Sequence, residues 1–270
     1  MIAKYGTEEY GFEVLKRMIF KRLGLDCNYY RENYLRRRID LRMKKYGLKS
    51  YWDYIRLLRS SDDEWPLLVK DLTVNYTSFF RDPDVFFYFK TRILPKLANN
   101  KKVIRILSAG CSSGEEPYTI SMIVNEVLGS SINDYLISIY AIDIDDYALK
   151  KAMLGEYEAR VVEKLSKTYI RRFFEKIDGK YRVKRCVKRL VHFKKMDLTQ
   201  GIKYRNLDVI FCRNTFIYFS VEAQARICMD FYEALNRNGY LIIGKTEILP
   251  EEAAKKFICV DMEARIFQKI

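Results

Sequence analysis

The spacing of hydrophobic residues changes along the chain, from helical in the first quarter to alternating strands and helices beyond it. Between residues 8 and 70, apolar positions recur every three or four residues. The first such positions are Phe12, Leu15, Ile19 and Leu23. The same spacing returns over residues 34–47 and again over 51–61, where Ser50 precedes the segment as an N-cap. The pattern predicts an all-helical N-terminal region.

From about residue 102 onward, short runs rich in β-branched residues alternate with helical segments. The runs are residues 103–109, 135–143, 189–197, 207–212 and 239–244. This alternation predicts a parallel sheet covered by helices. Two last runs, 257–261 and 264–270, are separated by too few residues for a parallel crossover, so they predict an antiparallel hairpin. Five parallel strands ending in such a hairpin are typical of S-adenosylmethionine (SAM) methyltransferase sheets.

A small hairpin that turns at Asp178-Gly179 interrupts the alternation. We expect it to belong to an inserted β subdomain of about residues 176–195. The chain then divides into a helical domain over residues 1–72, a linker over 73–95 and an α/β domain over 96–270.

Composition and charge exclude some classes of protein and favour some kinds of partner. No apolar run is long enough to span a membrane, and the N-terminus lacks the apolar run of a signal peptide. Six scattered cysteines without a C-x-x-C pair, together with a single histidine, predict free thiols, a reducing cytoplasm and no metal site. The net charge of +14, concentrated in residues 21–46 and 164–195, favours an acidic partner: nucleic acid, an anionic membrane or an acidic protein surface. General solubility is the alternative.

The turn after the first predicted strand carries the first candidate chemistry. It spells G-C-S-S-G over Gly110–Gly114, and the next helix begins with Glu115 and Glu116. Such a turn usually exposes amides to a phosphate, but a carboxylate there suits a cationic ligand and repels a pyrophosphate. Asp143 ends the second strand, where a carboxylate commonly holds ribose hydroxyls. A SAM-like ligand fits this pattern; the alternative is that both glutamates only complement the helix dipole.

Five segments, in this order, resemble the chemotaxis receptor methyltransferases, the CheR family. They are residues 72–86, 108–122, 141–160, 208–219 and 239–249. The resemblance covers nearly the whole chain. It implies a Rossmann-like SAM-dependent methyltransferase sheet, mostly parallel with an antiparallel C-terminal strand, an N-terminal all-helical domain and a small inserted antiparallel β subdomain. It also implies methyl transfer from SAM to the side-chain carboxylates of receptor glutamates, giving methyl esters and S-adenosylhomocysteine, in sensory adaptation.

The family pattern implies a set of SAM-binding residues. In this sequence they are Asn75, Thr77, Arg81, Gly110, Glu115, Asp143, Asp197, Leu198, Arg213, Asn214 and Thr215. The linker residues would lie over SAM, Glu115 would hold its amino-acid end, and Asp143 its ribose. Asp197 and Leu198 would flank the adenine, although many relatives carry Asn in place of Asp197. The family's usual G-H-S-E near the fifth strand stands here as Gly244-Lys245-Thr246-Glu247, which argues against an indispensable role for that histidine.

The chemistry itself makes small demands on the protein. A glutamate carboxylate is ionised at pH 7, so no general base is needed. Arg81 and Tyr218 are the candidates for orienting the incoming carboxylate. The alternatives are a salt bridge at a helix start for Arg81 and an ordinary core position for Tyr218. Cys212 lies in an apolar strand, where a thiol is usually inert.

The resemblance implies acidic receptor methylation helices as the partner, met by Arg36, Arg37, Arg38 and Arg42. The alternative is a solvated helix face. The short hairpin loop favours an enzyme that needs no receptor tether peptide, and we expect a cytoplasmic monomer. Two other functions stay open: a nucleic-acid methyltransferase, against which no D/N-P-P-Y/F motif follows the fourth strand, and a non-catalytic SAM-sensing or receptor-binding module.

Overall fold

The computed structural model describes residues 7–270, which fall into two compact units. The helical unit comprises the chain up to Val74 together with Tyr218–Gln224, and the α/β unit comprises Asn75–Ile217 and Ala225–Ile270. Each unit has its own buried apolar residues. The candidate ligand site predicted from the strand ends belongs to the α/β unit.

The helical unit contains four α-helices and a short 3-10 turn. They are α1 (Glu8–Leu23), η2 (Cys27–Tyr29), α2 (Glu32–Lys45), α3 (Tyr51–Ser60) and α4 (Glu64–Thr73). The Thr7 side chain accepts a hydrogen bond from the amide of Tyr10 and caps α1, which ends at Gly24 in the left-handed region. Ser50 caps α3 in the same way. The predicted helical segments and the predicted cap are therefore confirmed.

The α/β unit is built on a seven-stranded sheet of order β6-β2-β1-β7-β8-β10-β9. Its strands are β1 (Val103–Ala109), β2 (Leu136–Asp143), β6 (Val191–Lys195), β7 (Leu207–Cys212), β8 (Leu235–Ile243), β9 (Phe257–Asp261) and β10 (Ile266–Lys269). The first five strands of that order pair in parallel, whereas β10 pairs antiparallel with both β8 and β9. This sheet confirms the predicted fold class.

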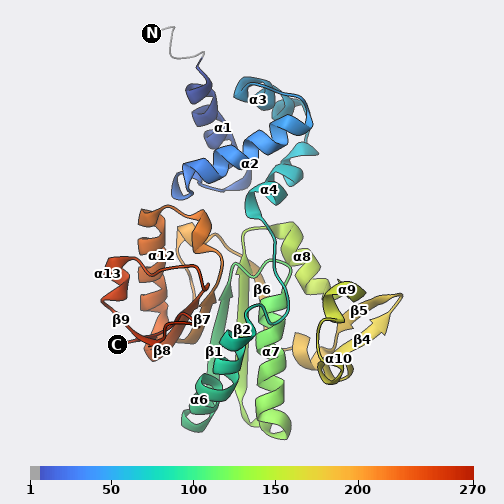
Figure 1. The fold of residues 1–270 in the computed structure, drawn as a ribbon, viewed down its shortest axis with the longest axis vertical. Helices are drawn as coiled ribbons and strands as arrows, with labels where there is room; N and C mark the ends of the chain where they lie inside the picture. Colours follow the sequence, from blue (N-terminus) through green and yellow to red (C-terminus); the bar gives the residue numbers. More distant parts are fainter. Residues whose placement is uncertain (1–6) are drawn as a thin grey trace. The chain divides into compact units, whose positions relative to one another are not determined.

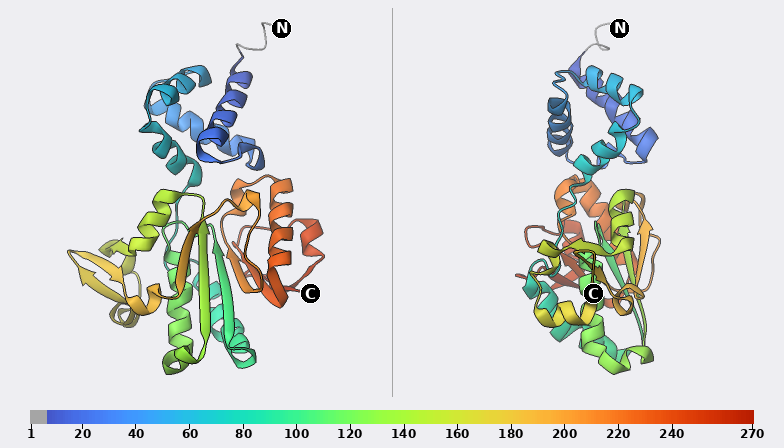
Figure 2. Two further views of the ribbon diagram at one scale, coloured as in Figure 1. Left: turned by 180° about the vertical axis from the view of Figure 1, so that it is seen from behind. Right: turned by 90° about the vertical axis from the view of Figure 1, so that its right-hand side faces the viewer.

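Helices line the sheet, and α7 lies beside β2 and β6 (Figure 2). The longer helices of the unit are α7 (Glu115–Leu128), α8 (Asp146–Leu154) and α12 (Val221–Ala234). Shorter ones are α5 (Pro83–Tyr88), α6 (Leu94–Asn100), α9 (Ala159–Val162), α10 (Lys167–Phe173), α11 (Arg185–Lys188) and α13 (Glu251–Ala254). A π-helix, η3 (Phe89–Ile93), follows α5, and the 3-10 turns are η4 (Gly129–Asp134), η5 (Leu198–Gln200) and η6 (Phe216–Tyr218). Phe86 and Phe89 pack on Phe211 of β7, at ring-centroid distances of 5.9 and 5.3 Å, which anchors α5 and η3 on the sheet.

A second, three-stranded antiparallel sheet projects from the unit, in the order β3-β5-β4. It consists of β3 (Glu156–Glu158), β4 (Phe174–Ile177) and β5 (Lys180–Val183). The turn between β4 and β5 is formed by Asp178 and Gly179, both with positive φ, as the hairpin signal predicted.

The structure corrects the expected limits of the insertion, about 176–195. The small sheet begins earlier, at Glu156, because β3 pairs with β5. It also ends earlier, since residues 191–195 form β6 and pair with β2 in the large sheet. A three-residue strand such as β3 is too short to show an alternation in the sequence.

Candidate functional site

The glycine turn lies at the edge of the sheet where the parallel strands β1, β2 and β7 all end. Gly110 and Gly114 have φ values of 75° and 93°, in the left-handed region. A Cβ added to Gly110 would lie 2.5 Å from Thr215 Oγ1, and one on Gly114 would lie 2.9 Å from Cβ of Ala152. Only glycine fits either position, and the turn is therefore in close contact with the loop that follows β7.

Asp143 connects the turn after β1 with the turn after β2. Its side chain is buried, and its two oxygens accept hydrogen bonds from the amides of Ser112 (2.8 Å) and Asp145 (2.9 Å). Burial raises the pKa of Asp143 to about 6, with the two amides opposing the rise. The last residue of β2 thus holds the glycine turn in place and presents a carboxylate at the strand ends.

The segment of residues 75–82, here called the strap, is hydrogen-bonded to the same edge. The Asn75 side chain donates to Oδ2 of Asp145 (2.7 Å) and accepts from the Ser112 hydroxyl (3.0 Å). Further along, the amide of Phe80 donates to Oγ1 of Thr119 on α7 (3.2 Å). Asn75 and Asp143 are therefore brought to the same two turns, and their SAM-binding roles stay predictions.

Arg81 and Thr77 both belong to the strap. Arg81 donates to the carbonyl oxygen of Tyr76 (3.0 Å), and its guanidinium lies 5.5 Å from the centre of the Tyr76 ring. Thr77 is half-buried. These contacts are compatible with the predicted roles of both residues but do not test them, so the roles remain predictions.

Glu115 and Glu116 are the first two residues of α7, and both side chains are largely shielded from solvent. Glu115 is 4% exposed and accepts a hydrogen bond from the Ser113 hydroxyl (2.7 Å). Burial raises its pKa against that hydrogen bond. Burial also raises the pKa of Glu116, which accepts from the Ser108 hydroxyl (2.8 Å) and faces Arg213. Two buried carboxyl groups exceed what a solvent-exposed helix start needs to complement its dipole.

Arg213 holds the end of the strap through contacts that the sequence did not reveal. Its buried guanidinium forms an ion pair with Asp82, lies 3.4 Å from Oε2 of Glu116 and donates to the carbonyl of Arg81 (2.9 Å). These contacts give Arg213 a positioning role for the strap, and its predicted contact with SAM stays a prediction. No sequence signal linked Asp82 or Glu116 to Arg213, because the pairing arises only from tertiary packing.

The loop after β7 is fixed by Glu247, another residue that sequence reasoning missed. Its carboxylate accepts hydrogen bonds from the amides of Gly244 (2.6 Å), Asn214 (2.9 Å) and Ile217 (3.3 Å). The only signal was the four-residue motif that ends with this glutamate. Lys245, where relatives carry histidine, forms an ion pair with Asp84 (2.7 Å).

Asp197 and Leu198 follow β6 and reach the same edge. The amide of Met196 donates to the carbonyl oxygen of Asp143 (2.9 Å), which brings the two chain segments together. Asp197 caps the η5 turn by accepting from both the amide and the hydroxyl of Thr199 (2.8 Å each). Leu198 is buried.

The residues at this edge suit a ligand that has a cationic centre and hydrogen-bond donors. Two buried carboxyl groups, Asp143 and Glu115, carry raised pKa values because burial disfavours their charged forms, and Lys151 opposes the rise for Glu115 only in part. The Oδ1 atom of Asn214 is buried and has no hydrogen-bond partner within residues 7–270. Buried carboxyl groups with raised pKa values, together with one unpaired acceptor, match SAM, which carries an ammonium group, a sulfonium and ribose hydroxyls. Across that same stretch, no cluster of His, Cys, Asp or Glu is arranged to hold a metal ion.

Tyr218 belongs to the helical unit. Its ring lies 4.9 Å from that of Tyr34, and its carbonyl accepts from the amide of Arg31 (2.9 Å). Its catalytic role stays a prediction.

The four arginines of α2 occupy different environments. Arg42 is 4% exposed and forms ion pairs with Glu64 and with Asp71 (3.2 Å). The prediction that Arg42 meets a receptor is therefore corrected, since its guanidinium is used inside the helical unit.

The other three arginines lie nearer the surface. Arg36 pairs with Glu32 and Glu9, its guanidinium 4.0 Å from the centre of the Phe12 ring. Arg37 is exposed, while Arg38 lines a cavity of about 370 Å³ with Leu41, Lys44, Lys45 and Asp71. These three remain candidates for a partner surface.

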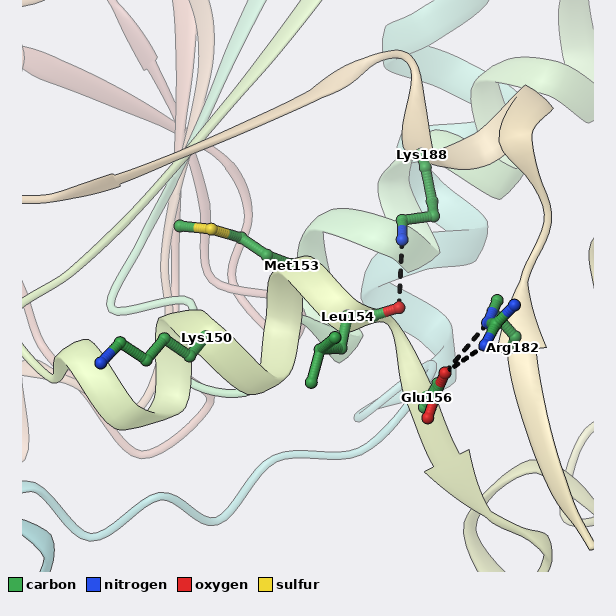
Figure 3. A pocket seen from close by; sticks show the side chains of 6 residues that line it. All are labelled: Lys150, Met153, Leu154, Glu156, Arg182 and Lys188. Atoms are coloured by element: carbon green, nitrogen blue, oxygen red, sulfur yellow. Dashed lines mark hydrogen bonds and ion pairs between the residues drawn. The ribbon is translucent and has the colours of Figure 1, made fainter. Parts of the chain in front are cut away.

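A larger cavity, of about 540 Å³, lies between α8 and the small sheet (Figure 3). It is lined by Lys150, Met153, Leu154, Glu156, Arg182 and Lys188. Two of its cations are engaged: Arg182 pairs with Glu156 (2.6 Å), and Lys188 donates to the carbonyl of Leu154 (3.0 Å). None of the predicted SAM-binding residues lines it.

Comparison with known proteins identifies the family of the chain. The family model described as "CheR methyltransferase, SAM binding domain" matches residues 75–266, and "CheR methyltransferase, all-alpha domain" matches residues 11–73. The sheet and its edge thus define a methyltransferase with a SAM-binding domain. The chain belongs to the CheR methyltransferase family, as its resemblance implied.

Several curated relatives are similar over most of their length. The chemotaxis protein methyltransferase of Vibrio parahaemolyticus is 34% identical, over 86% of this chain and 87% of its own. That of Borreliella burgdorferi is 32% identical over 87% of both chains. Chemotaxis protein methyltransferase 1 of Pseudomonas aeruginosa is 32% identical, over 88% of this chain and 90% of its own. Among the helices of residues 7–270, none is long and apolar enough to span a membrane.

Proposed function

We propose that the protein transfers a methyl group from SAM to the side-chain carboxylate of specific glutamates in chemotaxis receptors, in the cytoplasm. The products are glutamate methyl esters and S-adenosylhomocysteine. The observation that carries the proposal is the group of buried acceptors at the strand ends: the carboxyl groups of Asp143 and Glu115, whose pKa values burial raises, and the unpaired Oδ1 of Asn214. The relatives named as chemotaxis protein methyltransferases support the choice of receptor as substrate.

The protein's own part in the reaction is binding and alignment. Asp143 accepts the ribose hydroxyls, Glu115 pairs with the ammonium end, and Asp197 with Leu198 flanks the adenine. When bound, SAM supplies a methyl group on a positively charged sulfur and leaves as a neutral thioether. The strap, anchored through Asn75 and Asp82, excludes water from the reacting atoms.

The acceptor carboxylate needs orientation and no proton transfer, because a glutamate is already ionised at pH 7. Arg81 and Tyr218 orient one carboxylate oxygen toward the methyl carbon, opposite the sulfur. Their hydrogen bonds to that carboxylate are weak enough to leave the attacking oxygen nucleophilic. The new bond joins this oxygen to the methyl carbon, while the electron pair of the broken bond stays on sulfur.

The acidic methylation helices of the receptor meet α2 through Arg36, Arg37 and Arg38. Charge complementarity of this kind mainly raises the rate of encounter and weakens with salt. The protein acts as a monomer and does not act on nucleic acid.

Labelled SAM, incubated separately with receptor cytoplasmic fragments and with RNA, tests the proposal. We expect base-labile label on the receptor fragment, because a methyl ester hydrolyses in alkali. Label on RNA would identify a nucleic-acid methyltransferase instead, and label on neither would leave a non-catalytic module.

Asp143→Ala is the matching variant, and we expect it to lose both SAM binding and label. Asp146→Ala is its control, since this neighbouring acid is exposed and pairs with Lys195 on the surface. Unchanged SAM affinity of Asp143→Ala in calorimetry would contradict the position of the site.

A further inference from the structure

Glu247 is a buried acid that no step of the proposed reaction uses. It is 3% exposed, and burial raises its pKa in spite of the amide groups that face it. One of its oxygens accepts from the amides of both Gly244 and Asn214, and the other accepts from the amide of Ile217. A buried carboxylate is costly to keep unless it satisfies donors that would otherwise be unpaired. Here all three donors are backbone amides of two loops.

The first of these loops, residues 213–217, forms one wall of the candidate SAM site. Thr215 lies so close to the glycine turn that a Cβ on Gly110 would approach its hydroxyl oxygen to 2.5 Å. Arg213 holds Asp82 at the end of the strap. Asn214, at a φ of 56°, presents the buried Oδ1 atom without a partner within the described residues. The position of this loop therefore affects the turn, the strap and an unpaired acceptor together.

The second loop, which follows β8 and contains Gly244, also approaches the Glu247 carboxylate closely. A Cβ on Gly244 would lie 2.7 Å from the backbone nitrogen of Asn214 and 2.7 Å from Oε2 of Glu247. Gly244 does not have a positive φ, so its requirement for glycine comes from this close approach alone. The absence of a side chain at Gly244 therefore allows the Glu247 carboxylate to accept the hydrogen bond from the Asn214 amide.

We propose that Glu247 is a positioning residue for SAM: its carboxylate fixes the loop of residues 213–217 against the glycine turn. This inference rests on the proposed function, because it assigns a role at the same SAM site. Glu247 acts through the loop and touches neither SAM nor the receptor carboxylate.

The test compares Glu247→Gln and Glu247→Ala with the wild-type chain in binding of S-adenosylhomocysteine by calorimetry. Glutamine can keep the two amides on one oxygen but places its NH₂ group against the amide of Ile217. Alanine leaves all three amides unpaired. We expect the Kd to rise in the order wild type, Gln, Ala, by about tenfold or more for alanine, which corresponds to losing one or two buried hydrogen bonds.

Asp208 provides a matched control for a purely structural role. It is also a buried acid (2% exposed) that accepts from a backbone amide, that of Arg105 (2.9 Å), and from the Asn236 side chain (2.7 Å), and it forms an ion pair with Lys101. It lies at the amino end of β7, away from the strand ends that carry the candidate site. Asp208→Asn should lower the melting temperature as Glu247→Gln does, yet keep the Kd within about twofold.

Steady-state kinetics adds a readout that lost stability alone does not move. Glu247→Gln should raise the KM for SAM and leave the KM for the receptor fragment unchanged. The inference is overturned if folded Glu247→Ala binds S-adenosylhomocysteine as the wild type does. It is also overturned if Asp208→Asn weakens binding equally. If Glu247→Ala does not fold, the inference is tested by comparing the Kd of Glu247→Gln with that of Asp208→Asn. Failure of the wild type itself to bind would instead overturn the proposed function.

Discussion

Single carboxyl groups give the candidate site its electrostatic character. Asp143 is held at the strand ends by two backbone amides, and Glu115 by the Ser113 hydroxyl. Burial raises both pKa values. A cationic ligand placed beside them would favour their ionised forms, so its binding and their deprotonation are thermodynamically linked.

The affinity for SAM should consequently fall in mild acid. The pKa of Asp143 is about 6 in the folded chain, raised by burial from the ordinary value of 3.8. Above pH 6 the carboxyl group is ionised and binds the ligand. Below pH 6 it is protonated, so the Kd should rise by up to about tenfold for each pH unit. Calorimetric titration with SAM between pH 5 and 8 measures this slope. Asp143→Asn should bind weakly with a flatter profile, and a wild-type Kd that is constant over this range would contradict the assignment.

Arg42 illustrates a stabilising role for a residue first assigned to a surface. Its guanidinium pairs with Glu64, which is 1% exposed. Removing the guanidinium would leave a buried carboxylate without its cation. We expect Arg42→Ala to lower the free energy of unfolding by about 3 kcal/mol or more. Urea denaturation followed by tryptophan fluorescence is suitable, because Trp52 and Trp65 both belong to the helical unit. Arg37→Ala is the control, since Arg37 is exposed. Equal stability of the two variants would refute the buried pair.

Some of these residues could be located from sequence and others could not. Asp143 and Glu115 stand directly at the end of a strand and the start of a helix, so a local pattern places them at the sheet edge. Glu247 and the pairing of Arg213 with Asp82 depend on segments that approach each other only in the folded chain. Arg42 was misassigned because helical periodicity distinguishes apolar from polar positions, whereas burial of an arginine depends on an acid from another helix.

At the scale of elements, strands with continuous apolar runs were the most predictable. The limits of β1, β7 and β9 match the sequence runs residue for residue, and the runs of β1 and β7 are bounded on both sides by polar or turn-forming residues. The turn at Asp178-Gly179 was predictable for a similar reason, since both residues tolerate positive φ. The strap was recognised only through the family resemblance. It contains Phe80 and Asp82 at positive φ, and no propensity predicts such a conformation.

Helix α2 carries the prediction about partner binding. Reversing Arg37 and Arg38 to Glu changes the charge of its surface by four units and leaves the buried Arg42–Glu64 pair intact. We expect receptor methylation to slow, most strongly at low salt, while SAM affinity stays unchanged. The measurement is the initial rate of labelling of receptor fragments at two ionic strengths.

The control for α2 changes the same net charge at other exposed positions of the helical unit. Lys21→Glu with Lys49→Glu meets this requirement. If the control slows methylation as much as the α2 variant does, only the net charge of +14 matters and α2 is not the docking surface.

At the scale of the whole molecule, ligand binding at the candidate site should stabilise the fold, because the parts of the site come from regions of the α/β unit that are distant in sequence. The strap, the glycine turn, the segment after β6 and the loop after β7 meet at one edge. A ligand that contacts all four binds only the folded unit. Mass action then gives a stabilisation of about 2.7 kcal/mol at a ligand concentration one hundred times the Kd. We expect S-adenosylhomocysteine to raise the calorimetric melting temperature of the wild type by several degrees, increasing with ligand concentration. Asp143→Ala should show no such shift at the same concentrations, whereas Asp146→Ala should shift like the wild type. An equal shift in Asp143→Ala would mean that the ligand stabilises the chain from a site other than these strand ends.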